Sequence, residues 1–259
     1  MSGKKVIGVI PARWGSTRFP GKSLALIDGK PLIHRVIKRA LKARCLDVLL
    51  VATDDRRIAE AVDEVGVKAV MTRSDHPSGT DRIAEAVSGL NASIVINIQG
   101  DEPLIDPKLI DRLAGAMLSN REWDMATAAA PISDEEELRN PSVVKVVWDK
   151  DGRALYFSRS VIPFVRDEGM STHGLYWRHI GVYAYRSAFL TVLVKTAPCV
   201  LENVEKLEQL RALDIGGRIL VLKAARAGIG VDTPQDVKYV ERELAAMEKA
   251  GRMRKRVAK

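Results

Sequence analysis

A loop near the amino terminus concentrates groups that bind phosphate. Within residues 13–22 the sequence provides two guanidinium groups, one ammonium group, a hydroxyl and two glycines: Arg13, Arg18, Lys22, Ser16, Gly15 and Gly21. Charged donors of this kind form short, strong hydrogen bonds to phosphate oxygens, and glycine allows the backbone to approach them closely. The loop therefore predicts a triphosphate site, with a solvated surface loop as the alternative.

The same loop approaches the P-loop pattern of kinases and ATPases without matching it. Gly21-Lys22-Ser23 supplies the end of that pattern, but Ser16 stands where its first glycine belongs. A P-loop also passes directly into its helix, whereas residues 24–30 intervene here before the helix that Pro31 implies. The sequence also lacks the GxGxxG fingerprint of a dinucleotide site. A P-loop enzyme and a dinucleotide cofactor are therefore both disfavoured.

Two aspartates, Asp101 and Asp232, follow apolar runs that predict strands at 93–98 and 218–224. In an open parallel sheet, ligands bind at the carboxyl ends of the strands, so both side chains can reach that edge. Carboxylate oxygens at two such points suit Mg2+. An aspartate in such a place is also often a turn residue or a helix cap, and the pattern alone leaves both interpretations open.

These groups need a sheet to hold them, and the hydrophobic pattern of the first half predicts one. Short apolar runs alternate with amphipathic segments, which is typical of strands joined by crossover helices in a mostly parallel sheet. The predicted strands are 6–12, 48–53, 68–72 and 93–98, and the predicted helices are 31–44, 55–65, 80–88 and 107–119. Suitable starting residues for the helices are Pro31, Asp54 or Asp55, Ser78 or Thr80, and Pro107.

After about residue 124 the pattern changes to extended runs, which predicts a mixed-sheet extension. The expected strands are 125–132, 143–149, 154–159, 179–186 and 218–224, and the expected helices are 187–195, 203–214 and a last one from Pro234 to about Ala250. Residues 149–152 indicate a hairpin turn, and 163–174 an exposed loop.

Composition narrows the class of protein. A chain of 259 residues with 46% hydrophobic residues can bury one large core, so one domain is expected. The chain has no apolar run of 18 residues, so we expect a soluble, cytoplasmic protein without membrane insertion. The formal net charge is +8, and six positive charges lie in the basic tail 249–259. Without this tail the net charge would be about +2. A nucleic-acid-binding module needs its cations on one folded face and is therefore disfavoured.

The loop from Ile10 to Lys22 resembles the nucleotide-binding loop of sugar nucleotidyltransferases, and most of all that of the 3-deoxy-manno-octulosonate (Kdo) cytidylyltransferases. Further stretches are similar to that family in the same order along the chain: 75–82, 97–103, 154–163, 179–186, 207–211 and 230–234. Trp14 replaces a more usual tyrosine and Phe19 a leucine, and both keep an apolar body. Residues 196–204 depart from the proline-rich stretch expected there, which affects the expected loop shape beside the sugar pocket.

The resemblance implies a Rossmann-like three-layer α/β/α fold with a mixed, mostly parallel sheet and a small antiparallel extension. It implies one domain, 1–259, in which about 133–215 contribute a sugar-binding and dimerisation extension. It also implies a homodimer, Mg2+ dependence and transfer of CMP from CTP to Kdo, giving CMP-Kdo and pyrophosphate. Kdo is the inner-core sugar of lipopolysaccharide. A related ulosonic acid, such as an amino analogue of Kdo, is the alternative acceptor, which a substrate panel would distinguish.

The resemblance also assigns site residues. Those expected to bind CTP are Arg13, Ser16, Arg18, Lys22, Arg73, Ser78, Gly79 and Thr80. Asp101 and Asp232 would hold Mg2+ and, with Lys22, form the catalytic group. Those expected to bind the sugar are Gln99, Arg159, His179, Tyr183, Glu208 and Gln209. Arg159 would pair with the Kdo carboxylate, and Glu208 and Gln209 with its hydroxyls.

Overall fold

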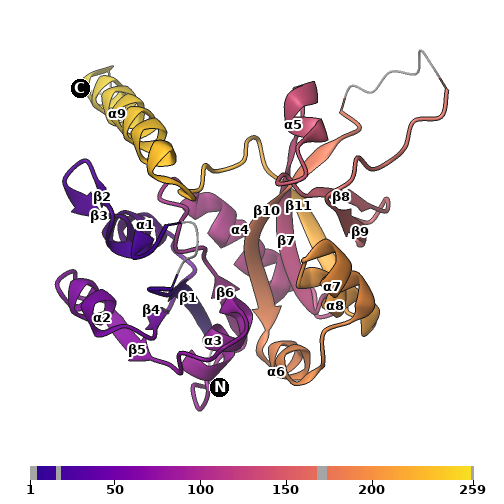
Figure 1. Ribbon diagram of the computed structural model, residues 1–259, viewed down its shortest axis with the longest axis horizontal. Helices are drawn as coiled ribbons and strands as arrows, with labels where there is room; N and C mark the ends of the chain where they lie inside the picture. The colour runs from indigo at the N-terminus through magenta and orange to yellow at the C-terminus, as the bar shows by residue number, and fades with distance from the viewer. Residues whose placement is uncertain (1–4, 16–18, 168–173, 258–259) are drawn as a thin grey trace.

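The computed structural model describes residues 5–15, 19–167 and 174–257. Over these residues the chain forms a nine-stranded sheet whose main path runs β11-β7-β10-β6-β1-β4-β5, with β8 and β9 attached beside β10 (Figure 1). The strands are β1 (Val6–Ala12), β4 (Val48–Thr53), β5 (Lys68–Met71), β6 (Ile94–Asn97), β7 (Met125–Pro131), β8 (Lys145–Trp148), β9 (Ala154–Ser158), β10 (Trp177–Arg186) and β11 (Ile219–Lys223).

Strand direction divides the sheet into two parallel parts. β6, β1, β4 and β5 are parallel to one another, and β11 is parallel to β7. β10 lies between the two parts and is antiparallel to both β6 and β7. The β8–β9 hairpin joins β10 through the pair Arg178 and Lys145. The predicted mixed, mostly parallel sheet with an antiparallel extension is thus confirmed.

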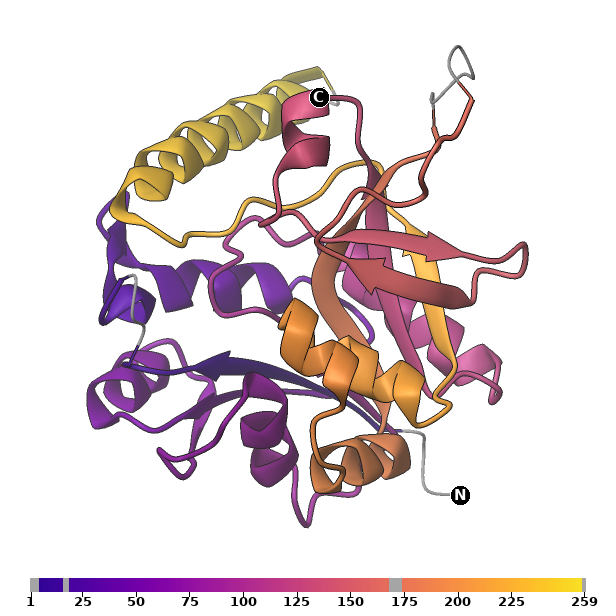
Figure 2. The same cartoon turned by 45° about the vertical axis from the view of Figure 1, so that its right-hand side comes forward.

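Helices cover both faces of the sheet, which gives the three layers seen in Figures 1 and 2. Apolar residues of α1 (Leu32–Ala40), α2 (Arg56–Asp63), α4 (Pro107–Ser119) and α9 (Pro234–Val257) pack into one core cluster. Those of α3 (Gly79–Ala86), α6 (Ser187–Lys195) and α8 (Gln209–Asp214) pack into the cluster on the other face. Among the described helices, none has the length and apolar composition needed to cross a membrane.

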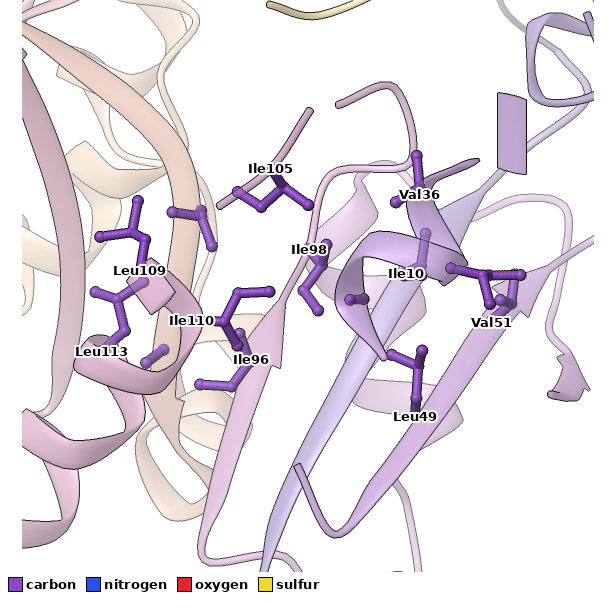
Figure 3. Packing of buried hydrophobic residues seen from close by; sticks show 14 of the residues in the cluster. Ile10, Val36, Leu49, Val51, Ile96, Ile98, Ile105, Leu109, Ile110 and Leu113 are labelled. Carbon is purple, nitrogen blue, oxygen red and sulfur yellow. The ribbon is translucent and has the colours of Figure 1, made fainter. Parts of the chain in front are cut away.

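The apolar runs form central strands because both faces of the sheet are covered. Residues 6–10 of β1 are all buried, as is typical of a parallel strand between two helical layers. Figure 3 shows Ile10 of β1, Val51 of β4 and Ile96 of β6 within the cluster that α1 and α4 complete. Each such side chain contributes about 1.5–3 kcal/mol through its burial.

Three of the helices begin at expected residues, two of them with an expected cap. The side chain of Asp55 accepts from the backbone N–H of Arg57, and that of Ser78 from Asp81, so α2 and α3 start at the predicted residues. Pro107 is the first residue of α4, behind the capping carboxylate of Asp106. These contacts satisfy backbone donors that have no partner within the helix.

The sequence pattern was wrong about one helix. The single helix expected at 203–214 is two, α7 (Val200–Glu205) and α8 (Gln209–Asp214). Lys206 breaks it with a left-handed backbone at φ 54°. Arg211 then joins the two helices by donating to both carboxylate oxygens of Glu202 at 2.7 and 2.6 Å.

Short elements that the pattern did not predict follow the basic loop and β7. Residues Lys22–Leu24 form a 3-10 turn, η1, and β2 (Leu26–Ile27) and β3 (Lys30–Pro31) form a hairpin before α1. A P-loop would lead directly into its helix, so this geometry agrees with the sequence argument against one. The helix α5 (Glu135–Arg139) follows β7 and was also not predicted.

Candidate active site

Lys22, Asp101 and Asp232 meet at the carboxyl edge of the parallel strands. The ammonium Nζ of Lys22 donates to Oδ2 of Asp101 at 2.6 Å and to Oδ1 of Asp232 at 3.2 Å. It also donates to the backbone carbonyl of Val231 at 3.2 Å. The backbone N–H of Val231 in turn donates to the carbonyl of Asp101 at 2.8 Å, which ties the two acidic segments together. Three residues distant in sequence are therefore fixed around one point.

The donor set at this point suits Mg2+. The carboxylates of Asp101 and Asp232 both pair with the ammonium group of Lys22, so their oxygens converge. A metal ion could be shared by the two carboxylates at the same point. Mg2+ prefers oxygen ligands and usually keeps part of its octahedral shell for phosphate oxygens and water. Among the described residues, no cluster of three or more acidic, histidine or cysteine side chains is placed to hold a metal. Asp101 and Asp232 would accordingly supply only part of the shell.

A cavity of about 320 Å3 adjoins these three residues, and we call it the nucleotide lobe. Of the residues expected to bind CTP, it is lined by Arg13, Lys22, Ser78 and Gly79. Ser16 and Arg18 lie outside the described residues. Arg73 is exposed, pairs with Asp75 at 3.0 Å and lines a separate hollow. The structure therefore does not bring Arg73 into this lobe.

Trp14 fixes the base of the basic loop. The backbone N–H of Gly21 donates to the carbonyl of Trp14 at 3.1 Å, which brings the two ends of the loop together. A Cβ at Gly21 would lie 2.9 Å from the indole ring, and φ at that glycine is +68°. On the ring, the guanidinium carbon of Arg57 lies 3.3 Å from the centroid. The small residue and the stacked cation hold the ring in place.

Arg82, which has no predicted role, lines the nucleotide lobe although it is only 3% exposed. Its Nη2 donates to Oδ2 of Asp54 at 2.8 Å, and its Nη1 donates to the hydroxyl of Thr72 at 2.6 Å. The other oxygen of Asp54 accepts from the backbone N–H of Trp14 at 3.4 Å. The only sequence signal was the position of Arg82 at the end of the 75–82 motif.

A second cavity, of about 430 Å3, lies beside the first, and we call it the sugar lobe. All six residues expected to bind the sugar line it: Gln99, Arg159, His179, Tyr183, Glu208 and Gln209. The two lobes share Pro11, Gly79, Gln99 and Glu208 as lining residues. Thr80 lines the sugar lobe, where its hydroxyl donates to Glu208 at 2.6 Å. The lobes therefore form one continuous site.

Arg159 is held by the backbone at the rim of the sugar lobe. Its Nε donates to the carbonyl of Glu205 at 2.6 Å, and its Nη1 donates to that of Pro141 at 2.9 Å. Lys145, another residue without an assigned role, donates to the carbonyls of Asn140, Val143 and Arg159. Carbonyls orient the guanidinium without neutralising it, so its charge remains available for an anion.

His179 lies deeper in the sugar lobe, and its surroundings determine its protonation. Its Nε2 lies 2.9 Å from the hydroxyl of Thr127, which is also within 3.1 Å of the carbonyls of Ile180 and Val182. With the single hydroxyl proton of Thr127 donated to one of these carbonyls, Nε2 of His179 carries its own proton and donates to the hydroxyl oxygen. Burial lowers the pKa of His179 to about 3. The ring is therefore neutral, with Nδ1 as an acceptor.

Other side chains of the sugar lobe are fixed by β10 and α8. The side-chain amide of Gln99 donates to the carbonyl of Gly181 at 2.7 Å, at an irregularity in the pairing of β10 with β7. Burial raises the pKa of Glu208, although the hydrogen bond from Thr80 opposes the change. Burial also raises the pKa of Tyr183, so its hydroxyl keeps its proton and can donate. The lobe thus offers donors, acceptors and the two cationic residues Arg159 and Lys206.

Comparisons with known proteins agree with this geometry. The family pattern described as Cytidylyltransferase matches residues 7–219. A 3-deoxy-manno-octulosonate cytidylyltransferase of Pelobacter propionicus is 47% identical, over 94% of this chain and 99% of the relative. The protein of the same name from Syntrophobacter fumaroxidans is 50% identical, over 93% and 97%.

Solved structures give the same result. A CMP:2-keto-3-deoxy-manno-octonic acid synthetase complexed with CTP superposes with a TM-score of 0.89 at 43% identity, covering 94% of this chain and 99% of that one. A 4-diphosphocytidyl-2C-methyl-D-erythritol synthase from Anaerococcus prevotii has a TM-score of 0.63 at 13% identity, which shows only a shared fold.

Proposed function

The chain belongs to the cytidylyltransferase family, and we propose that it transfers a cytidylyl group from CTP to Kdo, releasing pyrophosphate. One observation carries the proposal. Lys22, Asp101 and Asp232 lie beside the nucleotide lobe, which continues directly into a lobe lined by cations and hydroxyl-binding groups. An acidic, hydroxylated acceptor in one lobe would face a nucleotide in the other.

Nucleotidyl transfer is an in-line displacement at phosphorus, which needs alignment of the reactants and charge on the leaving group. In the proposed complex, Lys22 and Arg13 neutralise pyrophosphate oxygens as it leaves. Asp101 and Asp232 would hold Mg2+, which when bound supplies positive charge to the phosphate oxygens. The pair formed by Asp54 and Arg82 keeps Trp14, and with it the loop, in position.

The sugar lobe would orient the acceptor. The cationic Arg159 suits the carboxylate of Kdo, because its orientation is already set by backbone carbonyls. Glu208, Gln209 and the acceptor nitrogen of His179 suit hydroxyl groups. All ulosonic acids carry the carboxylate, so the hydroxyl contacts must distinguish among them. The names of the relatives favour Kdo over its amino analogue.

Three further properties belong to the proposal. We propose dependence on Mg2+, supported by the convergence of Asp101 and Asp232 on one cation. We propose a homodimer, supported by exposed apolar residues in the 133–215 extension. We also propose a role in lipopolysaccharide synthesis in the cytoplasm, because Kdo is an inner-core sugar and CTP is made in that compartment.

The test is pyrophosphate release by the purified protein. We expect release from CTP only when both Kdo and Mg2+ are present, with ATP, GTP and UTP giving much less. The alternative acceptor is tested directly by offering an amino analogue of Kdo in place of Kdo and comparing pyrophosphate release with the two acids. Absence of release with Kdo, or equal release without any acceptor, would overturn the proposal.

A further inference from the structure

A third cavity, of about 450 Å3, lies between α4, α9 and the segment 224–229, and we call it the α4–α9 pocket. It lies on the other face of β10 from the sugar lobe. Ile180 lines it, whereas the neighbours His179 and Gly181 line the sugar lobe, as expected for alternate residues of a strand. Ile105 and Leu109, labelled in Figure 3, form part of its apolar wall together with Ile229 and Met247.

Positive charge predominates around this apolar wall. Among the described residues, the pocket is lined by the cations Arg39, Lys108, Arg112 and Arg226 and by two acids, Asp106 and Glu243. Backbone carbonyls hold two of the guanidinium groups: Arg39 donates to Ile105 at 3.0 Å, and Arg112 donates to Lys223 at 2.8 Å. Burial lowers the pKa of Arg39; the charge of Asp106 opposes the change, and that of Arg226 adds to it. An anion would relieve the repulsion between the two arginines.

The walls of the pocket continue into both acidic segments of the active site. Ile229 leads through Val231 to Asp232, and the backbone N–H of Val231 is bonded to Asp101 at 2.8 Å. On the other side, Ile105 follows Asp101 by four residues and donates its backbone N–H to the carbonyl of Glu102 at 3.2 Å. A ligand that moves either wall would therefore move a carboxylate.

We propose that the α4–α9 pocket binds a small amphipathic anion, and that its occupancy changes the affinity of Asp101 and Asp232 for Mg2+. The ligand class is an apolar body with one carboxylate, sulfonate or phosphate group. The volume lies within the roughly 300–1,000 Å3 typical of small-molecule sites. The apolar wall and the excess of cations together select this class, since a simple inorganic anion would leave the wall solvated.

The probe is 8-anilinonaphthalene-1-sulfonate, which carries one sulfonate on an aromatic body and fluoresces when bound. The probe is titrated into the full chain in the presence of saturating CTP and Mg2+, so that the nucleotide lobe is already filled. We expect one bound probe per chain, and a loss of affinity of at least about tenfold in Arg226→Glu. Arg121→Glu makes the same charge change at an exposed residue outside the pocket and should leave binding unchanged.

A second variant tests the cavity rather than the charge. Ala225 is exposed and lines the pocket, so Ala225→Phe should fill it and abolish probe binding while CTP affinity and unfolding stay as in the original chain. Displacement of the probe by CTP, or equal probe binding by the original chain and by both pocket variants, would overturn the proposed site.

The coupling is measured separately and rests on the proposed function. Calorimetry gives the Mg2+ concentration that half-saturates CTP binding, with and without saturating probe. We expect a shift of at least about threefold that disappears in Arg226→Glu. An unchanged midpoint at full occupancy would overturn the coupling. Failure of the cytidylyltransferase proposal itself would instead appear as an absence of pyrophosphate release.

Discussion

At the scale of single residues, the site depends on charges shared between distant segments. Lys22 bonds to Asp101 and Asp232, which lie 79 and 210 positions further along the chain. All three side chains remain partly accessible, with exposures of 18, 29 and 48%. Partly exposed ion pairs contribute little to stability, typically about 0–1 kcal/mol. Their geometry therefore contributes little to folding, which agrees with their proposed role in binding and catalysis.

The first prediction concerns the two aspartates. Asp101→Ala and Asp232→Ala should each lower kcat by more than about 100-fold, since even residues behind metal ligands typically contribute 10–100-fold. The free energy of unfolding should change by no more than about 1 kcal/mol, because each change also removes repulsion between carboxylates. Pyrophosphate release and urea unfolding measure the two effects. A cooperative loss of structure with either variant would indicate a structural role instead.

Trp14 gives the second prediction. Trp14→Ala should raise KM for CTP about threefold to tenfold, because it removes the contact with Arg57 and the surface against Gly21, worth about 0.5–1.5 kcal/mol. Trp14→Tyr keeps an aromatic ring and should stay within about twofold of the original chain. Equal values of KM for these two variants would exclude the proposed support of the loop by this ring.

His179 gives a prediction about pH. Its folded pKa of about 3 lies below the ordinary value of 6.5, so below pH 6.5 the unfolded chain binds the proton more readily. Stability from this residue is thus complete above pH 6.5 and is lost as the pH falls toward 3. The loss reaches about 2 kcal/mol at pH 5, at 1.36 kcal/mol per pH unit.

The control for this prediction is His179→Gln, which cannot take up the proton. Glu102 titrates in the opposite sense: burial raises its pKa to about 7, so its contribution falls as the pH rises. Both chains contain Glu102 and the other titratable groups. The difference in unfolding free energy between His179→Gln and the original chain therefore removes the contributions of those groups. If that difference does not vary between pH 7 and 5, His179 is not held neutral by burial.

At the scale of elements, the sequence predicted the strands better than the connections. The runs of β1 and β4 were found within a residue because strands covered on both faces are apolar throughout. The ends of the strands predicted at 6–12, 93–98 and 218–224 then located Lys22, Asp101 and Asp232. The break at Lys206 was not predictable, since lysine is a good helix former and only tertiary contacts force its left-handed backbone.

Contacts between elements explain the other residues that the sequence did not reveal. Arg82 lies on a short amphipathic helix, where an arginine ordinarily faces solvent, and its burial depends on Asp54 from another loop. Thr127 similarly resembles an ordinary strand residue until β10 places His179 against it. Such pairs depend on how separate elements pack, which local periodicity does not encode.

The break between α7 and α8 gives the element-scale prediction. Lys206→Gly should keep or raise the free energy of unfolding, by up to about 1 kcal/mol, because glycine adopts φ 54° without strain. Lys206→Val should lower it by about 1–2 kcal/mol and raise KM for Kdo, since the same turn carries Glu208 into the sugar lobe. Urea unfolding and acceptor kinetics check both variants, and a valine variant as stable as the original would contradict the argument.

At the scale of the whole molecule, β10 separates two faces that each carry a cavity. One face carries the sugar lobe and the helices α6 and α8, whereas the other carries the α4–α9 pocket. The helices α6 and α7 add an exposed apolar surface: Val192, Val200, Leu201 and Val204 are 54, 76, 46 and 76% exposed. Val200 and Val204 lie one turn apart on α7 and share one side of it.

This apolar surface gives the last prediction, which concerns assembly. If it forms the proposed dimer interface, Val200→Glu combined with Val204→Glu places two charges where contact requires apolar groups, and the dimer should dissociate into monomers. Light scattering during size-exclusion chromatography measures the mass. Leu41→Glu is the control, because Leu41 is 56% exposed at the end of α1, outside the 133–215 extension. A double variant that remains dimeric would place the interface elsewhere, and one that unfolds in urea like the original chain while becoming monomeric would locate it on α7.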